Sequence, residues 1–378
     1  MGAILKLLIT GGAGFIGSRV ARRLLQAGYE VAVLDNFSPQ IHGDRGELPA
    51  DLRKEVRLFR GDVRDHELCA EALRGQEVLV HLAAETGTGQ SMYRVRHYSD
   101  VNIGATAGLM ELLLTGKYSV RSVVVASSRA IYGEGAAACR EHGVVYPHPR
   151  TREAMLRGEF EPKCPDCGAA TSIAPTPEEA PFHPSSLYGL TKQVQEQMTL
   201  MYATALGING FALRYQNVYG PGQSLRNPYT GILAIFSNQA RANQPIHIFE
   251  DGQESRDFVY VDDVVEATVR CIEARAQAPV SLNVGTGIPT SVTEVVNEIV
   301  RYFSSNSRVE VTGAFREGDI RHNCAATEKL RATLNFVPGW TFADGLRQFL
   351  AWSEGEPLEA RGYEESLAEM RKIGLMHG

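Results

Sequence analysis

The sequence lacks the features that mark membrane proteins and nucleic-acid-binding proteins. No apolar run approaches the roughly 20 residues needed to cross a bilayer. There is no basic cluster and no acidic tail, and 38 Lys and Arg against 44 Asp and Glu give a net charge of −6. A surface for nucleic acid or for a membrane usually carries concentrated positive charge. We therefore expect neither nucleic acid nor a membrane as a partner.

Cysteine is scarce, and targeting signals are missing from the start of the sequence. Six cysteines in 378 residues do not make a disulfide framework. The first apolar stretch, Leu7-Leu8-Ile9, stops at Thr10-Gly11-Gly12 without a signal-peptide cleavage pattern. These observations predict a cytoplasmic protein.

The first half alternates apolar runs with stretches of helical spacing. Apolar residues dominate the segments 4–9, 30–34, 56–59, 78–82 and 122–126, which we predict to be strands. Such runs are typical of parallel strands that are buried on both faces. Strands separated by helices predict an α/β fold with a Rossmann-type, doubly wound parallel sheet.

This alternation stops between residues 134 and 183, which are rich in Pro, Gly and Ala and contain Cys and His. Because structureless loops of this length are uncommon, we expect a small inserted subdomain. Regular patterns resume with a helix at 188–206. We predict an NAD-binding domain over 1–214, with 256–287 partly returning to it. A smaller mixed α/β substrate domain is predicted over 215–378.

The segment TGGAGFIG at 10–17 lies between the first predicted strand and the first predicted helix. Glycines at 11, 14 and 17 allow a tight turn, close approach to a pyrophosphate, and close packing of helix on strand. The N–H groups at the start of the helix would face the phosphates. A glycine-rich turn without a ligand is the alternative, and the flanking strand and helix argue against it.

Asp35 ends the second predicted strand, 18 residues after Gly17. An acidic residue at this place can bind the ribose hydroxyls of a dinucleotide. Asn36 and Phe37 follow, and no Arg is present there to accept a 2′-phosphate. The pattern favours NAD over NADP, although Asp35 alone could serve as a helix or turn cap.

Tyr188 and Lys192 are four residues apart at the start of a predicted helix, so they share one face. A neighbouring ammonium group lowers the pKa of a phenol and makes it a better base. Ser128 follows the fifth predicted strand, where side chains face the ligand crevice of a parallel sheet. A surface Tyr–Lys pair and a turn serine are the structural alternatives.

Taken together, the motifs resemble those of the extended short-chain dehydrogenase/reductase family, in its group of nucleotide-sugar epimerases and dehydratases. The likeness runs from Leu7 to about Phe336. It rests on TGGAGFIG at 10–17, LDN at 34–36, GDVRD at 61–65, HLAA at 81–84, VNIGAT at 101–106, SSRAIYGE at 127–134, YGLTK at 188–192, RYQNVYGPG at 214–222, RDFVYVDDV at 256–264, NVGTG at 283–287 and REGD at 316–319.

The resemblance implies a catalytic triad of Ser128, Tyr188 and Lys192. It implies that NAD contacts Gly11, Gly14, Phe15, Ile16, Gly17, Asp35, Asn36, Asp62, Val63, Leu82, Ala83, Ala84, Asn102, Tyr188, Lys192 and Tyr215. It implies that a nucleotide-diphosphate sugar contacts Thr88, Gln90, Ser128, Asn217, Arg256 and Arg316. Paired guanidinium groups suit a diphosphate because each can bind two phosphate oxygens.

Two features depart from the wider group. The dehydratases carry an Asp-Glu pair after the catalytic hydroxyl, whereas this chain has Arg129 and Ala130. The insertion also widens the usual gap between Ser128 and Tyr188. The first departure argues against dehydration and favours an isomerase, a 4-epimerase that works through a 4-keto sugar.

The segment GQSMY at 89–93 and the Cys-containing insertion are similar to those of dTDP-L-rhamnose 4-epimerases. This resemblance implies a dTDP-6-deoxyhexose substrate. The first alternative is an NAD(P)H-dependent 4-ketosugar reductase, which would use the same triad. The second is a cofactor-sensing regulator without catalysis, which usually lacks the Tyr–Lys pair. The resemblance further implies a homodimer.

The insertion contains two short motifs of the same shape. Cys139 and His142, and likewise Cys164 and Cys167, are each separated by two residues and followed by Gly. This spacing lets both side chains of one turn reach a single tetrahedral ion, and three Cys with one His are a known structural zinc set. The segment has few periodic apolar residues, so a metal could replace a core. We predict one structural zinc, with reduced thiols lying close together as the alternative.

Overall fold

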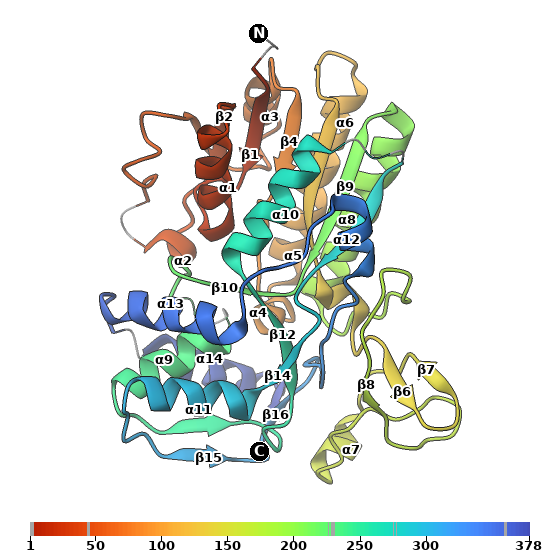
Figure 1. Cartoon of the computed structure of the whole chain (residues 1–378), viewed down its shortest axis with the longest axis vertical. Coiled ribbons are helices and arrows are strands. Elements are labelled where there is room, and N and C mark those ends of the chain that lie inside the picture. The colour runs from red at the N-terminus through yellow and green to blue at the C-terminus, as the bar shows by residue number, and fades with distance from the viewer. Residues whose placement is uncertain are drawn as a thin grey trace.

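The computed structural model describes residues 4–43, 46–225, 227, 231–274, 276, 278–358 and 361–378. Figure 1 shows a large sheet with its helices in the upper part of the view and smaller elements below. The insertion projects at the lower right of the view, beside the lower elements.

Seven parallel strands form the large sheet, in the order β13-β9-β5-β4-β1-β2-β3. The order reverses direction at β1, so the chain winds outward to both sides, as the sequence predicted. The strands are β1 (Lys6–Thr10), β2 (Glu30–Asp35), β3 (Arg57–Arg60), β4 (Val78–His81), β5 (Ser122–Ser128), β9 (Asn209–Tyr215) and β13 (Val280–Val284).

Helices cover both faces of this sheet because alternate side chains of each strand point to opposite faces. Leu7 and Ile9 of β1 pack in one core cluster, which also contains residues of α1 (Phe15–Gln26) and α10 (Val261–Glu273). Leu8, on the other face, packs with α3 (His66–Leu73) and α6 (Ala105–Leu114). Two helical layers therefore bury the sheet, and the expected fold class is confirmed.

Shorter segments connect these elements around the site. They are α2 (Pro39–His42), α4 (Thr88–Ser91), α5 (Val95–Tyr98), a π-helical turn η2 (Ser99–Gly104) and a 3₁₀ turn η3 (Arg129–Tyr132). The long helix α8 (Leu187–Leu206) also borders the site.

The lower part holds three small sheets and several helices. Its strands are β10 (Asn217–Tyr219), β11 (Ile246–Ile248), β12 (Ser255–Tyr260), β14 (Pro289–Ser291), β15 (Val309–Val311), β16 (Phe315–Arg316) and β17 (Met376–His377). Its helices are α9 (Ile232–Arg241), α11 (Val292–Tyr302), α13 (Phe342–Glu354) and α14 (Arg361–Lys372), while α12 (Glu328–Leu334) packs beside β13.

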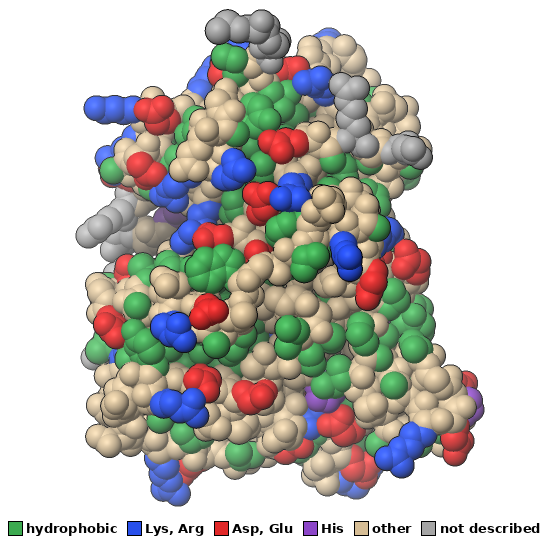
Figure 2. Space-filling view, in the orientation of Figure 1, with side chains coloured by type: hydrophobic (Ala, Val, Ile, Leu, Met, Phe, Trp, Pro, Cys, Tyr) green, Lys and Arg blue, Asp and Glu red, His purple; other side chains and the backbone are tan. Residues whose placement is uncertain are grey.

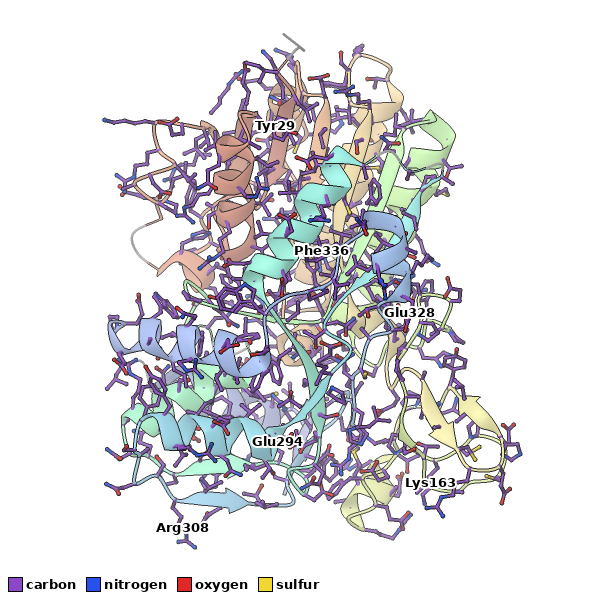
Figure 3. All side chains as sticks on the ribbon, in the orientation of Figure 1. Tyr29, Lys163, Glu294, Arg308, Glu328 and Phe336 are labelled. Carbon is purple, nitrogen blue, oxygen red and sulfur yellow. The ribbon has the colours of Figure 1, made fainter. Side chains whose placement is uncertain are left out.

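The insertion has its own small antiparallel sheet, β7-β6-β8, from β6 (Ala137–Cys139), β7 (Gly143–Val145) and β8 (Ser172–Ile173). Between β7 and β8 lies one short helix, α7 (Arg152–Leu156), and Lys163 marks the same segment in Figure 3. The core of this sheet is a cluster of four buried residues, two of them cysteines: Ala137, Cys139, Val145 and Cys164. So small a core provides little hydrophobic stabilisation.

The surface in Figure 2 carries Lys and Arg side chains interspersed with Asp and Glu, without a large area of one charge on this face. Among the helices of the described residues, none combines the length and the apolar character that a membrane crossing requires.

Candidate functional site

The glycine-rich turn joins β1 to α1 and leaves no room for side chains. Gly11 has a φ of +70°, and a Cβ there would lie 2.8 Å from the Ala83 nitrogen. A Cβ on Gly17 would lie 2.3 Å from the Gly11 carbonyl oxygen. Helix α1 starts after Gly14 without a side-chain cap. The backbone N–H groups of its first turn are therefore free to bind an anion.

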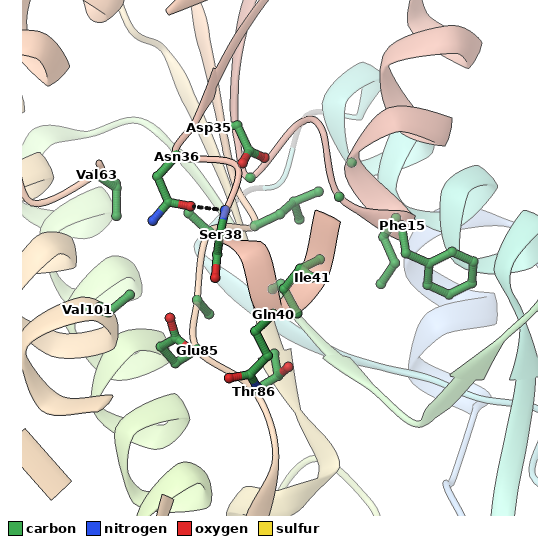
Figure 4. Close-up of a pocket in the computed structure, with 18 of the residues that line it drawn as sticks. Phe15, Asp35, Asn36, Ser38, Gln40, Ile41, Val63, Glu85, Thr86 and Val101 are labelled. Atoms are coloured by element: carbon green, nitrogen blue, oxygen red, sulfur yellow. Dashed lines mark hydrogen bonds between the residues drawn. The ribbon is translucent and has the colours of Figure 1, made fainter. Parts of the chain in front are cut away.

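Asp35, at the end of β2, holds the neighbouring backbone in place. Its two carboxylate oxygens accept hydrogen bonds from the N–H groups of Ala13 and Phe37, both at 2.9 Å. Each oxygen retains a second lone pair for a ligand hydroxyl. Figure 4 shows Asp35 near Asn36, whose side-chain oxygen accepts a hydrogen bond from the Ser38 N–H at 3.0 Å.

Asp62, after β3, is held as a carboxylate. Two hydrogen bonds from the Arg64 side chain, at 2.8 and 2.9 Å, are the main reason that its pKa is lowered to about 2. Asn36 donates a third side-chain hydrogen bond, at 3.1 Å. Asn36 and Asp62 thereby join the ends of β2 and β3 along one wall.

These elements enclose a cavity of about 390 Å³, the cofactor cavity. Fifteen of the sixteen residues expected to contact NAD line it: Gly11, Gly14, Phe15, Ile16, Gly17, Asp35, Asn36, Asp62, Val63, Leu82, Ala83, Ala84, Tyr188, Lys192 and Tyr215. The sixteenth, Asn102, lies behind the wall. Its side chain is fully buried, accepts from the Glu85 N–H at 2.8 Å, and donates to Thr191 at 2.9 Å.

Ser128, Tyr188 and Lys192 come from β5 and the first turns of α8. Helix α8 begins after Ser186, whose hydroxyl caps it by accepting from the Gly189 N–H at 3.2 Å. This start places Tyr188 and Lys192 on the turn that faces the end of β5. All three residues line the cofactor cavity, so the structure brings the expected triad together.

Burial acts on both ionisable members of the triad. It raises the pKa of Tyr188, while a hydrogen bond with Ser128 and the charge of Arg129 lower it in part. Burial lowers the pKa of Lys192 to about 7. Lys192 donates to the Gln195 side chain at 2.6 Å. Proton transfer at this site therefore depends on charges that offset the burial of Tyr188.

A second cavity of about 310 Å³, the substrate cavity, lies beside the first. Ser128 and Tyr188 line both cavities, so their hydroxyl groups lie where the two meet. Of the other residues expected to contact the substrate, four line this cavity: Thr88, Asn217, Arg256 and Arg316.

Gln90 lines neither cavity. It is 5% exposed, it exchanges hydrogen bonds with Gln40 at 3.2 Å, and it accepts from the Tyr98 hydroxyl at 3.1 Å. The structure therefore places Gln90 behind the wall that Thr88 forms.

The two expected phosphate ligands differ in how they are held. Arg256 donates to three backbone carbonyls, those of Ser255 at 2.8 Å, Ile320 at 2.9 Å and Arg321 at 3.0 Å. Arg316 forms an ion pair with Asp319 at 2.9 Å. Both guanidinium groups are fixed before any ligand binds, which reduces the entropy cost of binding.

A buried ionic cluster, which the sequence motifs do not predict, joins the insertion to the substrate cavity. Arg150 pairs with Glu134 at 3.0 Å and with Glu250 at 2.8 Å, and each of these three side chains is 3% exposed. Arg321 also pairs with Glu250, at 2.9 Å, and Arg150 donates to the Asp319 carbonyl at 3.0 Å. Glu250 and Asp319 line the substrate cavity.

The four predicted metal ligands lie together in the insertion. The Sγ atoms of Cys139 and Cys167 are 3.7 Å apart, and Nδ1 of His142 is 3.6 Å from Sγ of both Cys139 and Cys164. All four donor atoms lie within 4.8 Å of one another.

Comparison with known proteins agrees with this geometry. The NAD dependent epimerase/dehydratase family matches residues 7–154 and 166–285. A dTDP-L-rhamnose 4-epimerase of Burkholderia thailandensis is 36% identical over 92% of this chain and 94% of its own length. A UDP-glucose 4-epimerase structure from Thermotoga maritima, solved with UDP-glucose, is 28% identical, with a TM-score of 0.74 and coverage of 93% and 99%.

A UDP-glucose 4-epimerase of Thermus thermophilus, solved in complex with NAD, is also 28% identical, with a TM-score of 0.72. The match covers 93% of this chain and 100% of that one. The resemblance drawn from the motifs is confirmed, and with it the prediction of an enzyme of the isomerase type. The chain belongs to the NAD dependent epimerase/dehydratase family.

Proposed function

We propose that the chain is a nucleotide-sugar 4-epimerase that keeps NAD bound between turnovers. The observation that carries this proposal is the position of Ser128 and Tyr188 on the walls of both cavities. A hydroxyl pair at such a junction can act on a sugar while the sugar faces a cofactor.

The residues of the cofactor cavity fit NAD. A Cβ at Gly11 or Gly17 would collide with neighbouring backbone atoms. The turn therefore needs glycine, and its exposed backbone lets a ligand approach closely. Asp35 and the first turn of α1 would hold ribose and pyrophosphate. We infer that residues 1–214, with part of 256–287, form the NAD-binding domain, and that 215–378 supply most of the substrate site. NAD, when bound, supplies a hydride acceptor.

The chain's own residues handle protons and orientation. Tyr188, as a phenolate, takes the proton of the sugar C4 hydroxyl and later returns it. Ser128 donates a hydrogen bond to the same oxygen and keeps it within reach of Tyr188. Lys192 adds positive charge beside the phenolate when it is protonated, and its pKa of about 7 lets it exchange protons near neutral pH.

For the substrate we propose a dTDP-6-deoxyhexose such as dTDP-L-rhamnose. The likeness to the Burkholderia enzyme supports this choice, as does the GQSMY segment. The test incubates the purified protein with dTDP-L-rhamnose or UDP-glucose and follows the C4 epimer by NMR. Faster conversion of UDP-glucose would contradict the assignment of the sugar while supporting the reaction type.

Two measurements distinguish the proposed epimerase from the main alternative, a 4-ketosugar reductase. We expect the protein to release NAD when denatured after purification, and to epimerise the sugar without added cofactor. A reductase would instead consume one NAD(P)H for each sugar converted. The regulator alternative is disfavoured, because Tyr188 and Lys192 lie together on the cavity wall.

We further propose one structural zinc in the insertion. Zn–S bonds of about 2.3 Å and Zn–N bonds of about 2.0–2.1 Å give tetrahedral edges of about 3.8 Å between sulfurs and about 3.6 Å between sulfur and nitrogen. The observed separations of 3.7 and 3.6 Å fit these edges. Four protein ligands fill a tetrahedral ion, so the zinc would have no open position for catalysis.

The zinc proposal is tested by elemental analysis of protein purified without chelators. We expect one zinc per chain, and about half or less after Cys164→Ser, since a buried ligand is lost. Cys271→Ser is the matched control, because Cys271 is a buried cysteine on α10, far along the chain from the cluster. Protein with well under one zinc per chain would contradict the proposal.

We also propose a homodimer through α6 and α8. These helices expose Leu114, Leu190 and Met201, which are 47%, 44% and 58% exposed. Such apolar side chains on one helical pair mark an interaction surface. Analytical ultracentrifugation should show a dimer that Met201→Glu dissociates and that Val337→Glu, at another exposed apolar residue, leaves intact. A monomeric parent protein would contradict the proposal.

A further inference from the structure

Arg129 is a positively charged residue beside Tyr188, the proposed base. The proposed mechanism gives Arg129 no role. It directly follows Ser128 and begins the turn η3. It lines the substrate cavity together with Ser128 and Tyr188. The dehydratases of the family carry an acidic residue here, so this chain reverses the charge next to the catalytic hydroxyls.

The other cations around this end of the cavity have partners in the chain. Arg316 pairs with Asp319, and Arg256 donates to three backbone carbonyls. Lys192 donates to Gln195. The guanidinium group of Arg129, in contrast, has no hydrogen bond or ion pair with any of the residues that the structure describes.

The carboxylates around the two cavities also have partners or are only partly charged. Glu250 is paired with Arg150 and Arg321, and Glu85, after β4, lies 3.0 Å from His97. The pKa of Glu254 is raised to about 7 by burial and by Glu250, so this group is only partly charged at neutral pH.

Arg129 is partly buried, and a partly buried cation without a partner is stabilised by an adjacent anion. Burial and the nearby Arg256 lower the pKa of Arg129 to about 10, while Asp319 and Tyr188 act in the opposite direction. Asp319 already pairs with Arg316. The anion that the proposed reaction needs beside Arg129, before the sugar proton is taken, is the phenolate of Tyr188.

We propose that Arg129 is a positioning residue that stabilises the phenolate of Tyr188 and so lets this base form at lower pH. The proposal rests on the role of Tyr188 in the proposed function. Lys192 supplies less of this effect in the free protein, because it is buried and hydrogen-bonded to Gln195.

The decisive measurement titrates Tyr188 without any substrate. The ultraviolet absorbance of tyrosinate is followed against pH for the purified protein and for Tyr188→Phe, and their difference isolates one of the 14 tyrosines. The same pair is then prepared in an Arg129→Met background. We expect the pKa of Tyr188 to rise by about one pH unit or more, as when a nearby opposite charge is lost. Arg129→Lys should keep most of the effect.

The pH dependence of kcat/KM gives the second readout. The acid limb should move upward in Arg129→Met by the same amount as the titration, and return toward the parent in Arg129→Lys. Unchanged titration in Arg129→Met would overturn the proposal. So would a change in KM for the nucleotide sugar with an unmoved pH profile, because Arg129 would then bind the sugar itself.

The two proposals fail separately. If the Tyr188 titration shifts but no sugar is epimerised, the electrostatic role stands and the proposed function fails. If sugar is epimerised but the titration does not shift, the proposed function stands and the role of Arg129 fails. Thermal melting of each variant shows whether it is folded, and Arg129→Gln replaces Arg129→Met if the latter is not.

Discussion

Replacing Tyr188 by Phe removes one oxygen from the junction of the two cavities and keeps the ring. The hydroxyl interacts with Ser128, the charge of Arg129 acts on it, and Tyr188 lines both cavities. No buried donor is left without water access, so we expect the free energy of unfolding to change by no more than about 1 kcal/mol. NAD content should stay at the parent level, because the ring still lines the cavity.

The expected loss of turnover is much larger. A positioned general base contributes about 10²–10⁴-fold to rate, which corresponds to roughly 3–5 kcal/mol of barrier. Phe cannot carry a proton, and the Ser128 hydroxyl has no neighbouring phenolate to share one with. We therefore expect kcat to fall at least about a hundredfold, measured by NMR of the epimer formed from dTDP-L-rhamnose.

Tyr132→Phe is the matched control for this substitution. Tyr132 lies four residues after Ser128, donates to Asn283 Oδ1 at 2.8 Å, and accepts from Arg214 at 2.6 Å. It lines neither cavity. This variant should lose about 1–2 kcal/mol of stability and keep its turnover. If Tyr188→Phe retained about a tenth of the parent activity, Tyr188 would not be the base.

Three further substitutions test the walls of the two cavities. Arg256→Ala should weaken nucleoside diphosphate binding about tenfold or more in calorimetry, with little change in saturated turnover, since a charged hydrogen-bond donor is lost; unchanged affinity would exclude a phosphate role. Gly17→Ala should abolish copurification of NAD, because the new Cβ would lie 2.3 Å from the Gly11 oxygen; normal NAD content would show that the turn can widen. Arg64→Ala should destabilise the fold by about 1 kcal/mol at neutral pH, a value reduced for its partial exposure. Since the pKa of Asp62 is lowered to about 2, this difference should be present above about pH 4 and vanish as the pH falls through about 2; a constant difference in denaturant melts would contradict the pairing.

The sheet was predictable because its strands are buried on both faces and therefore appear as apolar runs. The predicted strand at 122–126 is observed as β5 (Ser122–Ser128), and the predicted helix at 188–206 as α8 (Leu187–Leu206). The two added residues of β5 are serines, whose side chains give no apolar signal.

The motifs identified the region of the site but could not separate its walls from the layer behind them. Gln90 and Asn102 lie in the expected segments, yet both turn into the protein and hydrogen-bond to it. A pattern in one dimension does not tell which side of a loop faces a cavity. The pair Arg150–Glu250 was missed because it joins residues 100 positions apart, in a stretch without periodicity.

The ionic cluster of Arg150, Glu134, Glu250 and Arg321 has a consequence for anyone who redesigns this chain. Cutting out residues 134–183 would remove Arg150 together with Glu134, and would leave Glu250, 3% exposed, with Arg321 as its remaining ion-pair partner. A buried charge that loses its sole partner costs about 3–5 kcal/mol. Glu250 keeps Arg321, so we expect a smaller loss, which still matters for an ordinary domain. The insertion therefore cannot be removed or replaced without a loss of stability in the rest of the chain. Replacing Glu250 by a neutral residue would not repair this loss, because it would take a partner from the buried Arg321 and reshape the wall of the substrate cavity.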